Sequence, residues 1–266
     1  MIWNTLDDSL SPKFPNLSDI VFNSKRDVLS IIGRVFDPLG ILSPIIIVAK
    51  LIFQDCWKGK LGWDDELPLS LKKDFQSFVD CLRFNEGVSV PRFYGFSPST
   101  VVELHCFCDA SVKAISACIY ARFFHEGEFC VSFVCGRARV SPMNPTSIPR
   151  LELLACVLLS SLYQDVISSF PNHHAFFYSD SVTCIFWIRN HTKKLKSWVN
   201  SRVSVVRRVC QCSRWFHVPS ECNIADLGSR GCTSGDQLSM WLHGPEFLYH
   251  EFKPETLSSV EIQTME

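Results

Sequence analysis

Along the first third of the chain, apolar side chains recur every three or four positions, which is the spacing of amphipathic helices. A capping-box pair, Ser24 and Asp27, opens the first predicted helix, and the turn-forming run Asp-Pro-Leu-Gly at 37–40 ends it. Pro44 starts a second predicted helix. A third carries the apolar residues Leu71, Phe75, Phe78, Val79 and Leu82. We therefore expect residues 1–95 to be mainly helical after a short extended start.

From about residue 100 the pattern changes to short runs with a period of two, which indicates β-strands. In VVELHCFCDAS this alternation places Asp109 at the end of a strand, on its more polar face. AISACIYARFF and EFCVSFVCGRAR predict two more strands, and Ser147-Ile148-Pro149 opens a long helix with a leucine stripe. AFFYS and SRWFHV predict a fourth and a fifth strand. The order βββαβααβα favours a mixed α/β fold, in which helices flank a five-stranded mixed sheet.

The composition of the chain predicts a folded protein, and its sequence shows no pattern typical of secretion. Its 266 residues are 47% hydrophobic, which is ample for a core. The 13 cysteines have neither a disulfide frame nor the spacing of a zinc finger, so reduced thiols are expected. There is no signal-peptide pattern, and the apolar window ILSPIIIVAKLIF is too short to span a bilayer. We expect an intracellular protein, cytoplasmic or nuclear, with no membrane partner.

Four carboxylates stand at predicted strand ends and helix starts: Asp109, Glu152, Asp180 and Asp226. Each has an ordinary structural explanation. Asp109 suits a turn, and Glu152 suits the first turns of a helix, where the dipole favours acids. Asp180 could be an N-cap, and Asp226 could act as a cap-like N3 residue. As a set, however, they supply the oxygen ligands that a hard cation such as Mg²⁺ requires.

The order Asp, Glu, Asp, Asp resembles the ribonuclease H active site. The words CDAS, PRLELLA, YSDS and HVPSECNIADLGSR resemble, more narrowly, the ribonuclease H region of BEL/Pao-type LTR retrotransposon polyproteins. RDVLSIIGRVFDPLGILSP and GWDDELP extend the resemblance to the segment that follows the polymerase palm in such polyproteins. The resemblance implies a thumb/connection-like segment at 1–95, a ribonuclease H-like domain at 96–248, and a polar tail at 249–266, expected to be disordered.

The resemblance also implies a metal-dependent endonuclease that cleaves the RNA strand of RNA–DNA hybrids. Two Mg²⁺ ions, with Mn²⁺ as the alternative, would clamp the scissile phosphate. Asp109 would bridge both ions, and Asp226 would hold one of them from the start of its helix. Glu152 and Asp180 would complete the shell of the other. His217 is a candidate auxiliary group for proton transfer or product release, with ordinary strand-end packing as the alternative.

Charge is segregated toward the C-terminal half. The formal net charge is −1, but the stretch 181–220 contains no acidic residue. Its basic residues include seven that are candidates for nucleic-acid binding: Arg189, Lys193, Lys194, Lys196, Arg202, Arg207 and Arg208. Tryptophans interleave with them, which is typical of a surface that binds a phosphate backbone and stacks on bases. The alternative is a solvated helix face.

Three functions remain open at this point. An active endonuclease is the first. The second is a non-catalytic remnant kept for nucleic-acid binding or assembly, or an unselected pseudogene product, because the polymerase signature Tyr-x-Asp-Asp is absent. The third, an aspartic peptidase, is disfavoured because neither Asp-Thr-Gly nor Asp-Ser-Gly occurs. Besides the hybrid, the expected partner is the remainder of a Pol polyprotein, whereas the sequence does not specify an oligomeric state.

Overall fold

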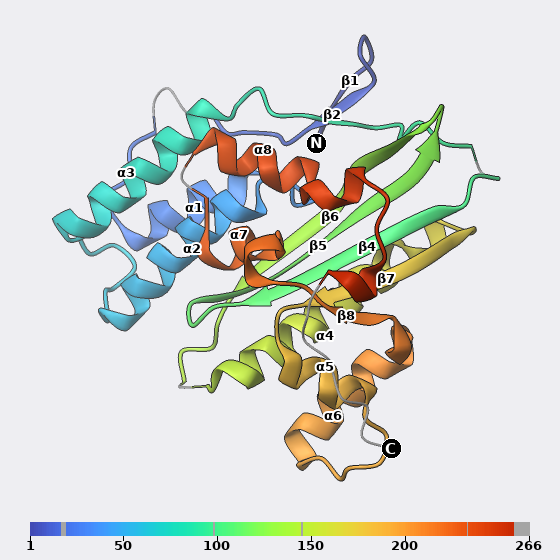
Figure 1. Ribbon diagram of the computed structural model, residues 1–266. Helices are drawn as coiled ribbons and strands as arrows, with labels where there is room; N and C mark the ends of the chain where they lie inside the picture. Colours follow the sequence, from blue (N-terminus) through green and yellow to red (C-terminus); the bar gives the residue numbers. More distant parts are fainter. Residues whose placement is uncertain (17–19, 98, 145, 233, 258–266) are drawn as a thin grey trace.

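The computed structural model describes residues 1–266 except 17–19, 98, 145, 233 and 258–266. At its centre is a five-stranded sheet with the order β6-β5-β4-β7-β8 (Figure 1). The strands are β4 (Val102–Ala110), β5 (Ala114–His125), β6 (Glu128–Val140), β7 (His173–Ser179) and β8 (Trp215–His217). The first three are antiparallel, and β7 and β8 continue the sheet in parallel with β4. The predicted mixed α/β fold with five strands is confirmed.

Three helices cover one face of this sheet (Figure 1). They are α4 (Ile148–Val166), α5 (Val182–Arg189) and α6 (Ser197–Val209). Side chains of β4 such as Leu104 and Cys106 pack there against the leucine stripe of α4. By length and composition alone, the stretch Ile148–Ser169 could cross a membrane. In this fold its leucines form the core beneath the sheet instead.

The other face is covered by helices from both ends of the chain (Figure 1). They are α1 (Lys25–Arg34), α2 (Ser43–Lys58), α3 (Leu69–Phe84), α7 (Ala225–Arg230) and α8 (Gly235–His243). The predicted capping box of Ser24 and Asp27 is present at the start of α1. Phe75 of α3 belongs to the same buried cluster as Phe107 of β4. The N-terminal segment and the sheet therefore share a core, and the division at residue 95 stays a prediction.

Short elements complete the chain. A three-stranded sheet joins β1 (Ile2–Asn4), β2 (Ser9–Ser11) and β3 (Val90–Pro91). The 3-10 helices are η1 (Ile167–Ser169), η2 (Cys212–Arg214), η3 (Ser220–Cys222), η4 (Glu246–Tyr249) and η5 (Pro254–Thr256).

The C-terminal segment 246–257 lies across the sheet, since η4 contacts β6 and η5 contacts β8. Arg122 of β5 fastens it by donating from Nε to the carbonyl of Leu248 and from Nη2 to that of His250, each at 2.7 Å. Of the polar tail expected at 249–266, residues 249–257 thus pack on the sheet, because the carbonyl of His250 and the ring of Phe252 find partners there. Residues 258–266 lie outside the described residues.

Candidate metal centre

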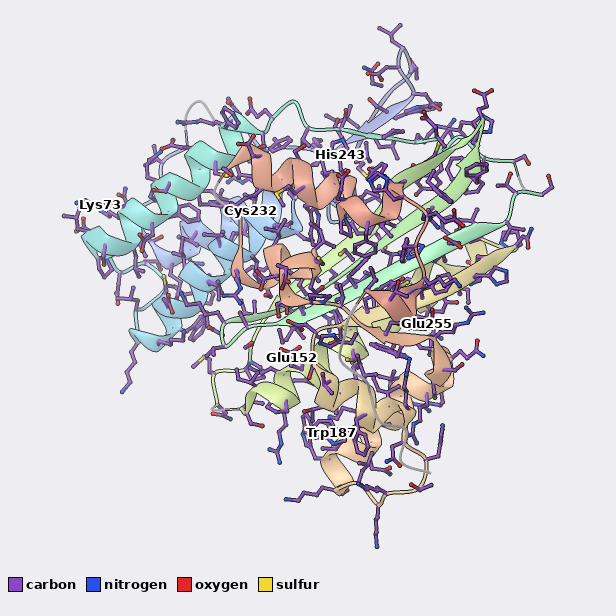
Figure 2. All side chains as sticks on the ribbon, viewed as in Figure 1. Lys73, Glu152, Trp187, Cys232, His243 and Glu255 are labelled. Carbon is purple, nitrogen blue, oxygen red and sulfur yellow. The ribbon has the colours of Figure 1, made fainter. Side chains whose placement is uncertain are left out.

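Three of the four acids singled out from the sequence come together at one edge of the sheet. Asp109 ends β4, Asp180 directly follows β7, and these parallel neighbours finish at the same edge. Glu152, near the start of α4, lies between that helix and the sheet (Figure 2). One carboxylate oxygen from each of the three residues lies within 4.8 Å of the others. The fold therefore gathers three carboxylates that are far apart in the sequence.

The environment of this three-acid cluster disfavours negative charge. Asp109 is 3% exposed and Glu152 is 8% exposed. Burial, together with the charges of Asp180 and Asp226, raises the pKa of Asp109 to about 6, although Ser229 opposes the rise. Burial, followed by the charges of Asp109 and Asp180, raises the pKa of Glu152 to about 9. Like charges so close together repel one another, so a cation between them would be strongly stabilising.

Two oxygens of the cluster lack hydrogen-bond partners within the described part of the chain. They are Glu152 Oε2 and Asp180 Oδ1, both buried. Buried polar atoms are nearly always satisfied, and an unsatisfied one calls for a specific explanation. A donor set made only of carboxylate oxygens, with lone pairs still available, suits Mg²⁺ or Mn²⁺. The residues present thus fit the cation that the sequence predicts.

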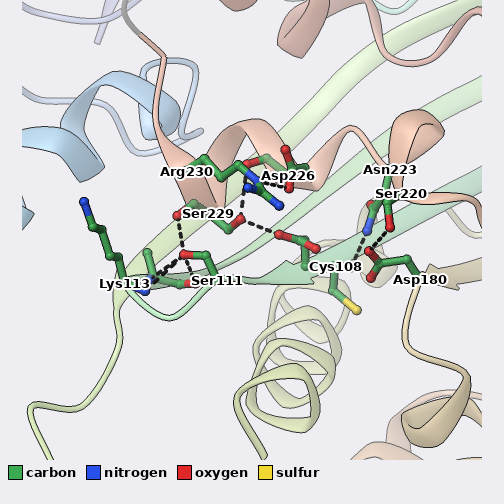
Figure 3. Close-up of polar contacts among 11 residues, drawn as sticks. Cys108, Ser111, Lys113, Asp180, Ser220, Asn223, Asp226, Ser229 and Arg230 are labelled. Atoms are coloured by element: carbon green, nitrogen blue, oxygen red, sulfur yellow. Dashed lines mark hydrogen bonds and ion pairs between the residues drawn. The ribbon is translucent and has the colours of Figure 1, made fainter. Parts of the chain in front are cut away.

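Asp226 lies next to the cluster but is not part of it. Its Oδ1 accepts a hydrogen bond from Arg230 Nε at 2.5 Å, one turn further along α7 (Figure 3). Ser229, from the same helix, is hydrogen-bonded to Asp109 Oδ2, and its hydroxyl also lies 3.1 Å from the carbonyl of Asp226. The fourth acid is therefore linked to Asp109 through Ser229, while its own carboxylate faces a guanidinium.

Several residues that hold the acids in place were not singled out from the sequence. Ser220 donates to Asp180 Oδ2 at 2.7 Å, and Asn223 Nδ2 donates to the carbonyl of Cys108 at 3.1 Å (Figure 3). Ser111 Oγ lies 2.9 Å from the carbonyl of Ser229, which ties the end of β4 to α7. Their position could have indicated a role, because they lie within the sequence motifs CDAS and HVPSECNIADLGSR, which also contain Asp109 and Asp226.

A glycine lets α7 approach the sheet closely enough for these contacts. A Cβ atom on Gly228 would lie 2.0 Å from Ser116 Oγ and 2.9 Å from Ser116 Cβ in β5, so any larger residue would force either Ser116 or the helix to move. Gly228 stands between Asp226 and Ser229 in the sequence. The close approach therefore sets the position of both residues relative to Asp109.

The residues next to Asp180 bear on two earlier predictions, the N-cap role of Asp180 and the auxiliary role of His217. The N-cap of α5 is Ser181, whose side chain accepts from the N–H of Cys184, so the N-cap explanation for Asp180 is wrong. His217 ends β8 opposite Ser179, and its Nε2 lies 3.2 Å from the carbonyl oxygen of Asp180. The auxiliary role of His217 stays a prediction.

The basic candidates fall into two groups. Lys193, Lys194 and Lys196 are exposed in the loop between α5 and α6, and Arg208 is exposed on α6. Arg202 lies over the ring of Trp198, at 4.2 Å from its centroid.

The other group is turned inward. Arg207 donates to the carbonyls of Ile188 and Trp187 at 3.0 and 2.9 Å, at the end of α5. Arg189 donates to the carbonyl of Trp215. Arg207 is thus engaged with the backbone through Nε and Nη2, and Arg189 through Nη2, although Arg189 Nε has no partner among the described residues. The exposed group remains the candidate surface for nucleic acid.

Comparison with known proteins points to one family. The sequence profile of the Pao retrotransposon-like RNaseH-like domain matches residues 24–181. That range includes the three-acid cluster and ends before Asp226. No curated protein matches the chain.

Among solved structures, the foamy viral protease-reverse transcriptase dRH in complex with double-stranded DNA is 10% identical, with a TM-score of 0.46 over 75% of this chain and 32% of its own. The foamy viral protease-reverse transcriptase in complex with an RNA/DNA hybrid is 13% identical, with a TM-score of 0.44 over 77% of this chain and 26% of its own. An N-terminal RNase H domain from Mycobacterium tuberculosis, fused to maltose-binding protein, is 10% identical, with a TM-score of 0.35 over 54% of this chain and 96% of its own.

The chain therefore spans no more than about a third of the length of the foamy viral proteins. The profile match, in contrast, covers more than half of this chain and includes the motifs CDAS, PRLELLA and YSDS in full. The protein belongs to the Pao retrotransposon-like family of RNaseH-like domains, as its sequence motifs predict.

Proposed function

We propose that this domain is a divalent-cation-dependent endonuclease that hydrolyses the RNA strand of RNA–DNA hybrids. The observation that carries the proposal is the three-acid cluster at the ends of β4 and β7. Its unpartnered oxygens point to a cation as the missing partner. Clustered acids with strongly shifted pKa values are typical of functional sites.

The residues of the chain fix the geometry of the site. Asp109 is held by Ser229, and Asp180 is held by Ser220, so neither carboxylate needs to reorient to accept a ligand. Bound Mg²⁺ ions would activate a water molecule and stabilise the leaving 3′ oxygen of the scissile phosphate. Asp109, central in the sheet, is the carboxylate best placed to be shared between ions. Asp226, on α7, lies beside the cluster, and its backbone carbonyl is 3.1 Å from Ser229 Oγ.

Basic side chains on α4, α6 and the α5–α6 loop support a nucleic-acid substrate. The exposed lysines of the α5–α6 loop carry charge toward phosphates, which are common to every sequence. Arg150, two residues before Glu152, and Arg202 both lie over the ring of Trp198, at 5.1 and 4.2 Å from its centroid. Such cation-aromatic groups suit a phosphate backbone and 2′-hydroxyls more than base edges. We therefore propose that the protein recognises the hybrid by its helical shape and its sugar-phosphate backbone, and not by its base sequence.

The test is hydrolysis of a labelled RNA strand by the purified chain. Hybrid, double-stranded RNA, double-stranded DNA and single-stranded RNA would be compared with Mg²⁺, with Mn²⁺ and with a chelator. The proposal expects cleavage of RNA in the hybrid alone, only when a divalent cation is present, and with 3′-hydroxyl products. Binding of the hybrid without cleavage under every cation condition would instead support a non-catalytic nucleic-acid-binding domain.

A further inference from the structure

The contact between Arg230 and Asp226 places a positive charge beside the acids. The Nε–Oδ1 distance is 2.5 Å, and the two residues are one helical turn apart on α7. The side chain of Arg230 is 70% exposed, and that of Asp226 is 32% exposed. Figure 3 shows Arg230 lying alongside Asp226.

The guanidinium acts on more than its direct partner. The hydrogen bond and charge of Asp226 raise the pKa of Arg230, and the charges of Asp109 and Asp180 add to the rise. Arg230 in turn opposes the rise in the pKa of Asp109. Arg230 is therefore a counter-charge for three acids from three different elements.

A divalent cation that also binds the carboxylate of Asp226 would compete with Arg230 for its oxygen. Asp226 Oδ1 is engaged by Arg230, whereas Glu152 Oε2 and Asp180 Oδ1 have no hydrogen-bond partner in the described structure. Ion pairs between exposed side chains are weak because water and salt screen them. A divalent ion already held by Asp109 could thus displace the guanidinium.

Resting on the proposed function, we propose that Arg230 and a divalent cation compete for the carboxylate of Asp226. Without the cation, Arg230 pairs with Asp226 Oδ1. When the cation binds, it replaces the Arg230 guanidinium at that oxygen. Because of this competition, the half-saturating concentration of the cation is higher than it would be without Arg230. Arg230 is in this sense a positioning residue, because it acts through Asp226.

The test is calorimetric titration of the full chain with Mg²⁺, and separately with Mn²⁺, without nucleic acid. Arg230→Gln removes the competing charge, and Arg230→Lys keeps a charge without the fork of donors. Arg83→Gln is the matched control, since Arg83 also pairs with an acid of its own helix, Asp80, on the exposed side of α3. Circular dichroism melts would verify that each variant is folded.

Arg230→Gln should lower the half-saturating concentration by roughly two- to fivefold, which corresponds to loss of one exposed ion pair. Arg83→Gln should match the wild type. In an Asp226→Asn background most of the effect of Arg230→Gln should disappear, because the contested oxygen has lost its charge and only the smaller long-range effect of Arg230 on Asp109 and Asp180 remains.

Unchanged or weaker cation binding by Arg230→Gln would overturn the competition and leave the proposed function standing. A gain of undiminished size in the Asp226→Asn background would overturn it too, since the effect would then be a general change of charge. Failure of the wild type itself to bind either cation would remove the metal centre, and the inference would fall with it.

Discussion

Glu152 occupies a place in α4 where an apolar side chain would pack better. Its neighbours Leu151 and Leu153 are buried in the core beneath the sheet. A carboxylate there loses hydration and lies within 4.8 Å of oxygens of Asp109 and Asp180. Both effects oppose folding when the group is charged. A destabilising acid in a well-packed helix is what a functional constraint would leave behind.

Glu152→Gln should therefore stabilise the protein in the presence of a chelator. A raised folded-state pKa means that the carboxyl group's stabilisation is complete below about 4.5 and is lost as pH rises through about 9. The advantage of the variant should grow across that range and reach at least about 1 kcal/mol at pH 8, or roughly 2–4 °C in Tm. Thermal melts from pH 5 to 9 measure it.

Glu86→Gln, at an exposed position after α3, is the control and should leave Tm nearly unchanged. A Glu152→Gln variant that melts below the wild type at pH 8 in chelator would show that the backbone hydrogen bond from Ala110 outweighs the cost of burial and of the neighbouring charges, which would contradict this account.

The acids could be found from the sequence because each belongs to a recognisable word at a strand end or a helix start. Their supporting residues could not. Ser229 and Asp109 are 120 positions apart, and nothing in the period of apolar residues indicates that a hydroxyl will reach across. The pairing of Arg230 with Asp226 had the ordinary spacing of a surface ion pair. The packing of α7 against β5 is what places the Arg230–Asp226 pair beside the other acids.

At the scale of elements, the α5–α6 loop carries three exposed lysines. Replacing Lys193, Lys194 and Lys196 with alanine should weaken hybrid binding and flatten its salt dependence. The expected loss of slope is about 0.7–0.9 log units per phosphate contact. Base preference should not change, because phosphate contacts carry no sequence information. Binding measured by fluorescence anisotropy over a range of salt concentrations tests this.

The matched control replaces three exposed lysines elsewhere with alanine: Lys13, Lys58 and Lys73. This control changes the net charge equally. If both triple variants bind alike, the loop is solvated surface, and the hybrid must lie against another part of the molecule.

The strap at 246–257 depends on one buried arginine. Arg122 is 5% exposed, pairs with Glu103 and donates to two carbonyls of the strap. Burial alone would raise the pKa of Glu103, but hydrogen bonds from His105 and Arg122 lower it to about 2. Arg122→Met should cost roughly 1–3 kcal/mol, since it leaves buried acceptors unpaired.

Hydrogen exchange locates the effect of Arg122→Met. Amides of 246–257 should exchange faster, whereas those of α4, on the opposite face, should keep their protection. Unchanged exchange in the strap would show that its apolar contacts alone hold it.

Most elements could be predicted because their local signals agree. Ser24 with Asp27, Pro44, and Ser147 with Pro149 each begin a helix where the pattern predicts one. The packing of residues 249–257 could not be predicted, because a polar segment with few apolar residues resembles a tail. Its stability comes from Arg122, which lies over 120 positions away.

At the scale of the molecule, helices on both faces enclose the sheet, and the acids reach one edge from every layer. Asp109 and Asp180 come from the sheet, Glu152 from the helices on one face, and Asp226 from those on the other. The order of predicted elements indicated a sheet flanked by helices, and in the structure the parallel strands β4 and β7 end at a common edge. The shared core of α3 and the sheet could not be foreseen, since no period in the sequence indicates which elements pack together.

The most direct test of the metal centre compares hybrid cleavage by the wild type and by Asp109→Asn in Mg²⁺. The substitution is nearly isosteric, so the fold should remain, but it removes the charge at the centre of the three-acid cluster. We expect cleavage to fall by at least about 10³-fold. Asp74→Asn, on the exposed side of α3, should cleave like the wild type. Wild-type activity in folded Asp109→Asn would contradict the assignment of these carboxylates as the catalytic metal site.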